Sequence, residues 1–287
     1  MRPIPESPSR HGPLLALVAL AGASCLVGST VHAGASADDR VGVEKFGADA
    51  IRDFALKVND ELDRRSVNVG ILARTGRPRS ELPRGVRYTH VAFVVFEAVR
   101  GTDGSIFHTY TTYNLYQRPP DHDDRSFLKQ DFTYDFIAGV AEPDVAVCVP
   151  DVKLQRRILA VIRSPTYRAL YHPEYNLFAN PWVDRYDNCV THVLKICVAA
   201  IYQTNDPVRI DADIRDYFQP TRIRLGLLRS VGAGFMKSIR TDDEDASGFQ
   251  TATYDSLNTF LEKNGLARES FVIAMDLRRD SQVALPQ

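Results

Sequence analysis

Two long runs of β-forming residues, separated by a tight turn, constrain this chain more than any other feature. Residues 88–99 are almost continuously apolar, and residues 105–117 are rich in Thr and Tyr, which favour strands. Between them, residues 101–104 contain an Asp-Gly pair that is typical of a hairpin turn. The sequence therefore predicts an antiparallel hairpin in which the numbers of facing residues sum to roughly 204–207.

Hydrophobic periodicity predicts the elements around this hairpin. Apolar residues at helical spacing indicate helices over residues 44–65, 151–162, 189–202, 212–218 and 253–264. Short apolar runs indicate strands over residues 67–73, 145–149, 222–228 and 270–276. The segment 132–139 fits either pattern, and residues 165–187 form an aromatic loop. This mixture predicts an α+β fold in which an antiparallel sheet packs on helices. We expect one domain over residues 38–287, with a C-terminal α/β extension after about residue 203.

Residues 1–33 have the order of parts of a secretory signal peptide. Basic residues precede an apolar stretch over 14–31, and Val31-His32-Ala33 resembles a cleavage site, with residues 35–37 as a second candidate. We therefore expect export, and a mature chain that is periplasmic or secreted. The alternatives are a lipoprotein modified at Cys25 and an uncleaved membrane anchor. The apolar run is short for a membrane span, so we expect none after cleavage.

Composition and motifs exclude several kinds of partner. The formal charge is −1, without the basic excess that a nucleic-acid surface shows. We find no phosphate loop, dinucleotide fingerprint or metal-ligand spacing, so we expect no cofactor and no metal. The acidic residues 242–245 lack the alternating spacing of a calcium loop.

Three cysteines remain after removal of the signal peptide: Cys148, Cys189 and Cys197. Cys189 and Cys197 share one predicted helix and lie about 12 Å apart along its axis, which is too far for a disulfide. The sequence leaves two arrangements open. Either Cys148 and Cys197 form a disulfide and Cys189 is free, or all three are reduced.

Cys189 is the candidate nucleophile. It opens a helix directly after Asp187 and Asn188, either of which can cap that helix. The positive end of the helix dipole and the free N–H groups of the first turn favour a thiolate. The same N–H groups can stabilise an oxyanion. The alternative is that Cys189 is a small apolar residue of the core.

His90 is the candidate base, because it opens the strongest strand after an irregular loop and can face a helix start across a cleft. His192, three residues after Cys189, is the alternative base. On the returning strand, Asn114 has the parity of His90 for an even pairing sum, so we expect it to orient the imidazole. His108 and Gln117 are the alternative residues for this role, although His108 lies farther along that strand.

Two further residues are candidates for substrate binding. Arg74 ends the strand that precedes the His90 loop and can bind a carboxylate or phosphate, although a surface ion pair explains it equally well. Tyr186 lies three residues before Cys189 and can donate to an oxyanion or simply pack.

In this chain a histidine opens a strand, a polar residue follows on the next strand, and a cysteine then starts a helix. This order resembles that of the circularly permuted papain-like (NlpC-type) proteins. Asn188-Cys189 followed by His192-Val193 is similar to the Asn-Cys motif of lecithin:retinol acyltransferase-like members. Over residues 69–76, 87–93 and 175–194 the chain also resembles an exported proteobacterial family of unknown function. Some members of that family carry Ser at the position of Cys189, which leaves the nucleophile open.

The resemblance implies a permuted papain-like domain and two functional hypotheses. The first is an exported thiol hydrolase or acyltransferase, in which Cys189 attacks an amide or ester, His90 moves the proton and Asn114 holds the imidazole. Its substrate would be a cell-wall peptide, a glycopeptide or a lipid acyl group. The second is a non-catalytic binding module that uses the same cleft. The sequence does not determine the oligomeric state.

Overall fold

The computed structural model describes residues 40–118, 125–223, 239–243 and 248–277 of the 287-residue chain. Its centre is a six-stranded sheet with the order β4-β3-β2-β1-β5-β8, and every neighbouring pair is antiparallel. The strands of this sheet are β1 (Val69–Arg74), β2 (His90–Arg100), β3 (Ile106–Gln117), β4 (Ser126–Phe132), β5 (Asp144–Pro150) and β8 (Ala267–Ala274). A second sheet pairs β6 (Thr221–Ile223) with β7 (Phe249–Thr251).

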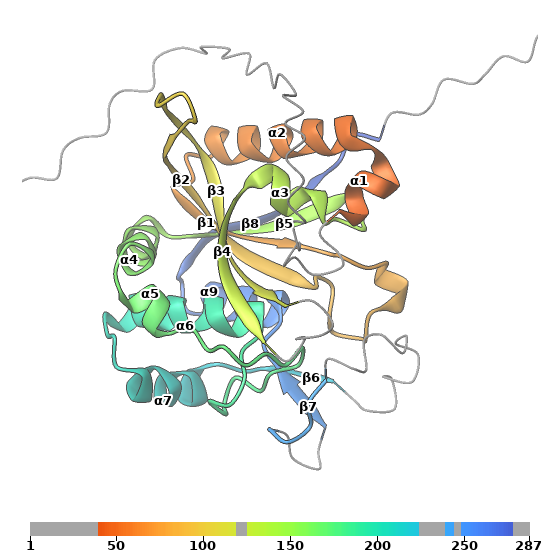
Figure 1. The fold of residues 1–287 in the computed structure, drawn as a ribbon. Helices are drawn as coiled ribbons and strands as arrows, with labels where there is room; N and C mark the ends of the chain where they lie inside the picture. The colour runs from red at the N-terminus through yellow and green to blue at the C-terminus, as the bar shows by residue number, and fades with distance from the viewer. Residues whose placement is uncertain (1–39, 119–124, 224–238, 244–247, 278–287) are drawn as a thin grey trace, which may run out of the picture. The chain divides into compact units, whose positions relative to one another are not determined.

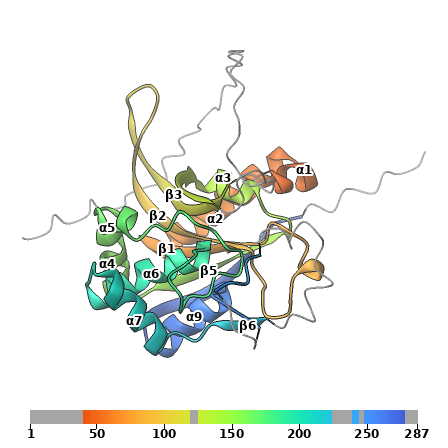
Figure 2. The ribbon, with the colours of Figure 1, turned by 60° about the horizontal axis from the view of Figure 1, so that its bottom comes forward.

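Helices cover both faces of the six-stranded sheet (Figure 1). One face carries α1 (Val41–Phe46), α2 (Ala48–Arg64) and α3 (Thr133–Ala138). The opposite face carries α4 (Val152–Ile162), α5 (Thr166–Ala169), α6 (Cys189–Tyr202), α7 (Pro207–Tyr217) and α9 (Tyr254–Lys263). Figure 2 shows the two helical layers on either side of the strands. The α+β prediction of an antiparallel sheet packed on helices is therefore confirmed.

Each sheet face has its own hydrophobic core, and strand alternation assigns residues to one or the other. Along β2, Val91 and Phe93 pack in the core under α6, whereas Ala92 and Val94 pack in the core under α2 and α3. Because successive side chains of a strand point to opposite faces, the parity of a residue decides which helices it meets. This parity positions the candidate site residues.

The predicted hairpin is present and has the expected register. β2 and β3 pair antiparallel with Phe93 opposite Tyr113, which is a pairing sum of 206. The even sum places Asn114 on the same face as His90, as the sequence predicts.

Several segments differ from the sequence-based predictions or were left open by them. The helix expected over residues 44–65 is divided at Gly47, whose φ of +86° is unfavourable for other residues. The ambiguous segment after residue 132 is α3, and β4 is a strand that its Lys, Gln and Asp residues concealed. β8, within the expected C-terminal extension, joins the central sheet beside β5. The predicted signal peptide, residues 1–33, lies outside the described residues.

Candidate functional site

Cys189 is the first residue of α6, as the sequence predicts. The side-chain oxygen of Asn188 accepts hydrogen bonds from the N–H groups of Val190 at 3.0 Å and Thr191 at 2.8 Å, which is N-capping. The Asn188 amide nitrogen also donates to Thr251 Oγ1 at 3.1 Å. The cap therefore fixes the start of α6 against the second sheet.

The Cys189 thiol is buried, and its Sγ donates to the carbonyl oxygen of Thr89 at 3.9 Å. Burial raises the pKa of this thiol to about 11, and the opposing effects of the Val91 N–H and the Arg74 charge are smaller. The effect of the helix N-terminus, which lowers the pKa of a thiol, is smaller here than the effect of burial, which raises it. The expectation of a stabilised thiolate is therefore wrong for this structure.

A small cavity of about 40 Å³ borders Cys189. Most of its described lining is apolar or aromatic, and includes Val86, Tyr175, Phe178 and Ala252. Neither an imidazole nor a carboxylate is among the described lining residues. Because about 10–15 Å³ of such space suffices for one water molecule, the cavity has room for a group of a few non-hydrogen atoms.

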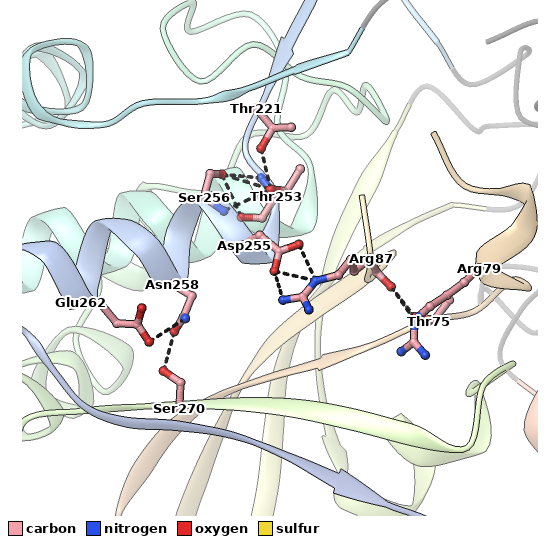
Figure 3. A network of polar contacts seen from close by, with 10 residues as sticks. All are labelled: Thr75, Arg79, Arg87, Thr221, Thr253, Asp255, Ser256, Asn258, Glu262 and Ser270. Atoms are coloured by element: carbon pink, nitrogen blue, oxygen red, sulfur yellow. Dashed lines mark hydrogen bonds and ion pairs between the residues drawn. The ribbon is translucent and has the colours of Figure 1, made fainter. Parts of the chain in front are cut away.

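A polar network joins two segments that contribute residues to the cavity lining, the one before β2 and the one before α9 (Figure 3). Arg87 Nε donates to both carboxylate oxygens of Asp255 at 3.0 Å, and the backbone oxygen of Arg87 accepts from Thr75 Oγ1 at 2.8 Å. Asp255 lies in the first turn of α9, where Thr253 and Ser256 form a capping box. The segment that leads into β2 is therefore tied to the start of α9.

His90 lies on the opposite sheet face, where it is buried. Its ring stacks on that of Tyr116 at 4.7 Å between centroids and lies 5.5 Å from that of Phe136 in α3. Burial, followed by the nearby charge of Arg74, lowers the pKa of His90 to about 3, although the hydrogen bond to Asn114 favours the charged form. The imidazole is therefore neutral near pH 7.

Asn114 contacts His90 across the hairpin. Its amide nitrogen donates to Thr112 Oγ1 at 3.0 Å and to Asp131 Oδ2 at 3.3 Å, so its oxygen accepts from His90 Nε2 at 3.1 Å. His108 lies opposite Ala98 and Gln117 opposite Ser126. Of the three candidates, Asn114 is the residue in contact with the ring.

The structure does not bring Cys189 and His90 together. Cys189 packs with Val91 in the core under α6, whereas the His90 ring packs on Phe136 in the core on the other side. The reason is strand parity, because α6 lies against the face to which the residues on either side of His90 point.

The two candidate substrate-binding residues also lie elsewhere. The Arg74 side chain is buried, donates to the carbonyl oxygen of Gly139 and lies 5.5 Å from the Phe136 ring centroid. It therefore forms neither a surface ion pair nor part of the cavity beside Cys189. Tyr186 donates to Asp242 at 3.1 Å and lines a separate, polar cavity of about 510 Å³.

A buried ion pair that the sequence pattern did not predict lies close to Cys189 in the chain. Lys195 Nζ lies 3.0 Å from Asp187 Oδ1 and 2.9 Å from Asp184 Oδ1. Asp187 is fully buried, and burial raises its carboxyl pKa although Lys195 opposes the shift. Burial lowers the pKa of Lys195, but the two carboxylates outweigh this effect and raise it. A lysine in the most apolar predicted helix was the available signal.

His192, the alternative base, is buried in α6 against the ring of Tyr167, 5.1 Å away between centroids. Both of its ring nitrogens lack a hydrogen-bond partner of normal geometry. Burial, followed by the charge of Lys195, lowers its pKa to about 3, and the backbone of Leu170 offsets this only in part. It does not line the cavity beside Cys189.

The cysteines agree with the reduced alternative, since Cys148, Cys189 and Cys197 are free and buried. In the described part of the chain, no three His, Cys, Asp or Glu side chains are grouped so that they could hold a metal ion. Among the described helices, none is long and apolar enough to cross a membrane.

Comparison with known proteins gives one match. The model of a family described as "Uncharacterized protein conserved in bacteria (DUF2145)" matches residues 61–261, which include β1 to β7 and all five candidate site residues. No curated protein and no solved structure matches the chain.

Proposed function

Because the chain belongs to this uncharacterised bacterial family, we propose a function from the site itself: an exported, non-catalytic module that binds peptides. The cavity beside Cys189 would accept one small aliphatic side chain, such as that of alanine or valine. The observation that carries this proposal is the lining of the cavity, which is mostly apolar and contains no general base among its described residues. Apolar lining with a few polar groups is the usual composition of a ligand pocket.

The state of the thiol supports binding over catalysis. The thiolate is the nucleophilic form, and a thiol with a pKa of about 11 is ionised in only about one molecule in ten thousand at pH 7. A nucleophile of this kind needs an adjacent base or a lowered pKa. To act as that adjacent base, the His90 side chain would have to move from one face of the sheet to the other.

We propose further that the fold is a permuted papain-like domain that has kept the helix and sheet of a cysteine hydrolase without its dyad. Two features support this idea: Cys189 opens a helix that packs on an antiparallel sheet, and His90 is held by Asn114 from the next strand. Export rests on the sequence of residues 1–33.

The test uses methyl NMR of Val190, whose side chain lines the cavity. The probes are blocked tripeptides Gly-X-Gly, in which X is Gly, Ala, Val or Phe. We expect Ala and Val peptides, at about 1–10 mM, to shift the Val190 methyls more than Gly or Phe peptides do. Ala252→Leu, which fills the cavity, should abolish these shifts, and Ala48→Leu at an exposed position of α2 is the matched control. Equal shifts from all four peptides would contradict the pocket.

The second candidate is the thiol hydrolase or acyltransferase, which the His90–Asn114 hydrogen bond and the helix-start position of Cys189 favour. Alkylation with iodoacetamide at pH 5–9, followed by mass spectrometry, distinguishes the two. A catalytic Cys189 should react well below the pH at which ordinary thiols do. A binding module should show Cys189 reacting slowly throughout, as buried Cys148, with a pKa of about 12, should.

A further inference from the structure

The outer edge of β4 is partly covered by the loop that follows α5. β4 is the last strand on its side of the sheet. At its first residue, Ser126 N donates to the Pro173 carbonyl oxygen at 2.8 Å, and the Ser126 carbonyl oxygen accepts from the Tyr171 hydroxyl at 2.7 Å. These contacts show that the backbone groups of Ser126 point away from β3.

The middle of the same edge is open. Since backbone groups alternate in direction along an antiparallel strand, those of Leu128 and Gln130 point outward like those of Ser126. In the part of the chain that the structure describes, no hydrogen bond reaches these four N–H and C=O groups. At the end of the strand, Phe132 N donates to Asp135 Oδ2 at 3.3 Å. The open groups therefore lie between two covered ends.

A groove of about 400 Å³ runs beside these groups, between the β3–β4 pair and the α4–α5 segment. Its apolar part includes Tyr113, Leu128 and Tyr167. Arg163 and Arg168 also line it, and both are exposed. Thus the groove combines an apolar surface with cationic side chains at a free strand edge.

The charges in this groove favour an anionic ligand. Among the described residues, neither Arg163 nor Arg168 forms an ion pair with a carboxylate. Lys129 also lines the groove, but its ammonium is 2.9 Å from Asp131. The nearby carboxylate of Glu97 already accepts hydrogen bonds from the side chains of Thr111, Tyr113 and Gln130.

We propose that an extended acidic segment of another protein pairs with β4 as an additional strand. Leu128 and Gln130 would supply two N–H donors and two C=O acceptors, which is the backbone pattern of strand addition. Side chains two residues apart on the added strand point to the same face. One apolar side chain would therefore lie on Leu128 and Tyr167, and a carboxylate two residues away would pair with Arg163 or Arg168. This site shares no residue with the pocket beside Cys189.

The experiment uses the mature protein and the blocked peptide Ser-Thr-Val-Thr-Glu-Thr-Ser, with a matched peptide in which Lys replaces Glu. We expect calorimetry to show binding of the Glu peptide, and at least about tenfold weaker binding of the Lys peptide. Hydrogen exchange should show that the Glu peptide protects the amide protons of Leu128 and Gln130. No binding by the wild-type protein, or equal binding of the two peptides, would overturn the proposal.

Two variants of Gln130 test the backbone contact directly. Gln130→Pro removes an outward N–H but no ladder bond to β3, so it should abolish binding. Gln130→Ala removes the same side chain but keeps the N–H, so it should bind at least about tenfold more tightly than Gln130→Pro. Arg168→Glu should weaken binding several-fold, whereas Arg156→Glu, an exposed control on α4, should not.

The remaining outcomes also decide the question. Binding that survives Gln130→Pro would overturn strand addition. Protection of the Leu128 and Gln130 amides that grows with protein concentration alone would assign this edge to a second copy of the chain, and would equally overturn the proposal. Circular dichroism of the Pro variant separates lost binding from lost fold, and the Ala and Arg168 variants keep the test valid if that variant unfolds.

Discussion

The two faces of the sheet at the start of β2 differ in how their polar residues are used. On the α3 face, His90 donates to Asn114, which donates in turn to Asp131, so these buried groups satisfy one another. On the α6 face, Cys189 borders a cavity, and neighbouring Asp187 is fully buried without a hydrogen bond of normal geometry to its carboxylate.

This difference separates a structural network from a place where a ligand can bind. Buried polar groups in proteins are normally hydrogen-bonded, and exceptions call for an explanation. On the α3 face the histidine is explained by its neighbours. Arg74 Nε on the α3 face also lacks a hydrogen-bond partner of normal geometry. On the α6 face, however, unsatisfied polar atoms coincide with unfilled space around the start of one helix, where the ion pair with Lys195 compensates Asp187.

The largest expected effect comes from removing that ion pair. Lys195→Met leaves Asp187 buried without a counter-charge, so the free energy of unfolding should fall by about 3–5 kcal/mol, as urea denaturation at pH 7 would measure. The control is Lys195→Met combined with Asp187→Asn, which should recover most of the loss. A loss below about 1 kcal/mol in the single variant would show that Asp187 is already protonated.

The next effect concerns the opposite face. Asn114→Leu removes the acceptor of His90 and a donor to Asp131, and should lower the free energy of unfolding by about 1–3 kcal/mol. A double-mutant cycle with His90→Phe should give a coupling of about 0.5–3 kcal/mol. Additive effects would mean that the hydrogen bond between these two side chains contributes nothing measurable.

The pH dependence of stability tests both faces together. The pKa of His90 and that of His192 are lowered to about 3 in the folded protein, against about 6.5 in the unfolded chain. Between these values the unfolded state binds protons that the folded state does not. Stability should therefore fall as the pH decreases from about 6.5 towards 3, by up to about 1.4 kcal/mol per pH unit for each histidine.

His192→Leu should remove one of these two contributions, because leucine does not titrate. Denaturation at pH 7 and pH 5 should show a smaller loss of stability in this variant than in the wild type. His108→Leu, at an exposed position of β3, serves as the control. An unchanged pH dependence in His192→Leu would mean that folding does not lower the pKa of this histidine.

Local sequence signals predicted what local interactions determine. The Asp-Gly turn and the two apolar runs predicted the hairpin and its register. Asn188 was one of the two residues expected to cap α6, and its side chain accepts hydrogen bonds from the first turn of that helix. Asn114 could be placed on the face of His90 because the facing residues of a hairpin follow from the position of its turn.

What the sequence did not predict depends on long-range packing. Strand alternation predicts which residues share a face with His90. It does not predict which of the two faces α6 covers, and that choice decides whether Cys189 lies near His90. β4 was missed because an edge strand with a polar surface lacks a continuous apolar run. The helix dipole at Cys189 was identified correctly, but its burial comes from segments that are far away in the chain.

The smallest expected effect returns to Cys189 and compares it with Cys197 of the same helix. Cys189 borders unfilled space, whereas Cys197 is fully buried in the core and is not among the residues that line the cavity. The cost of removing a buried atom rises with the density of packing around it and with the size of the cavity that it leaves. Cys189→Ala should therefore cost less than about 1 kcal/mol, since alanine is also favourable in a first helical turn. Cys197→Ala should cost about 1–3 kcal/mol, as urea denaturation would measure. If Cys189→Ala were the more destabilising of the two, the space beside Cys189 would not exist in solution, and the pocket proposed for an aliphatic side chain would have no place to form.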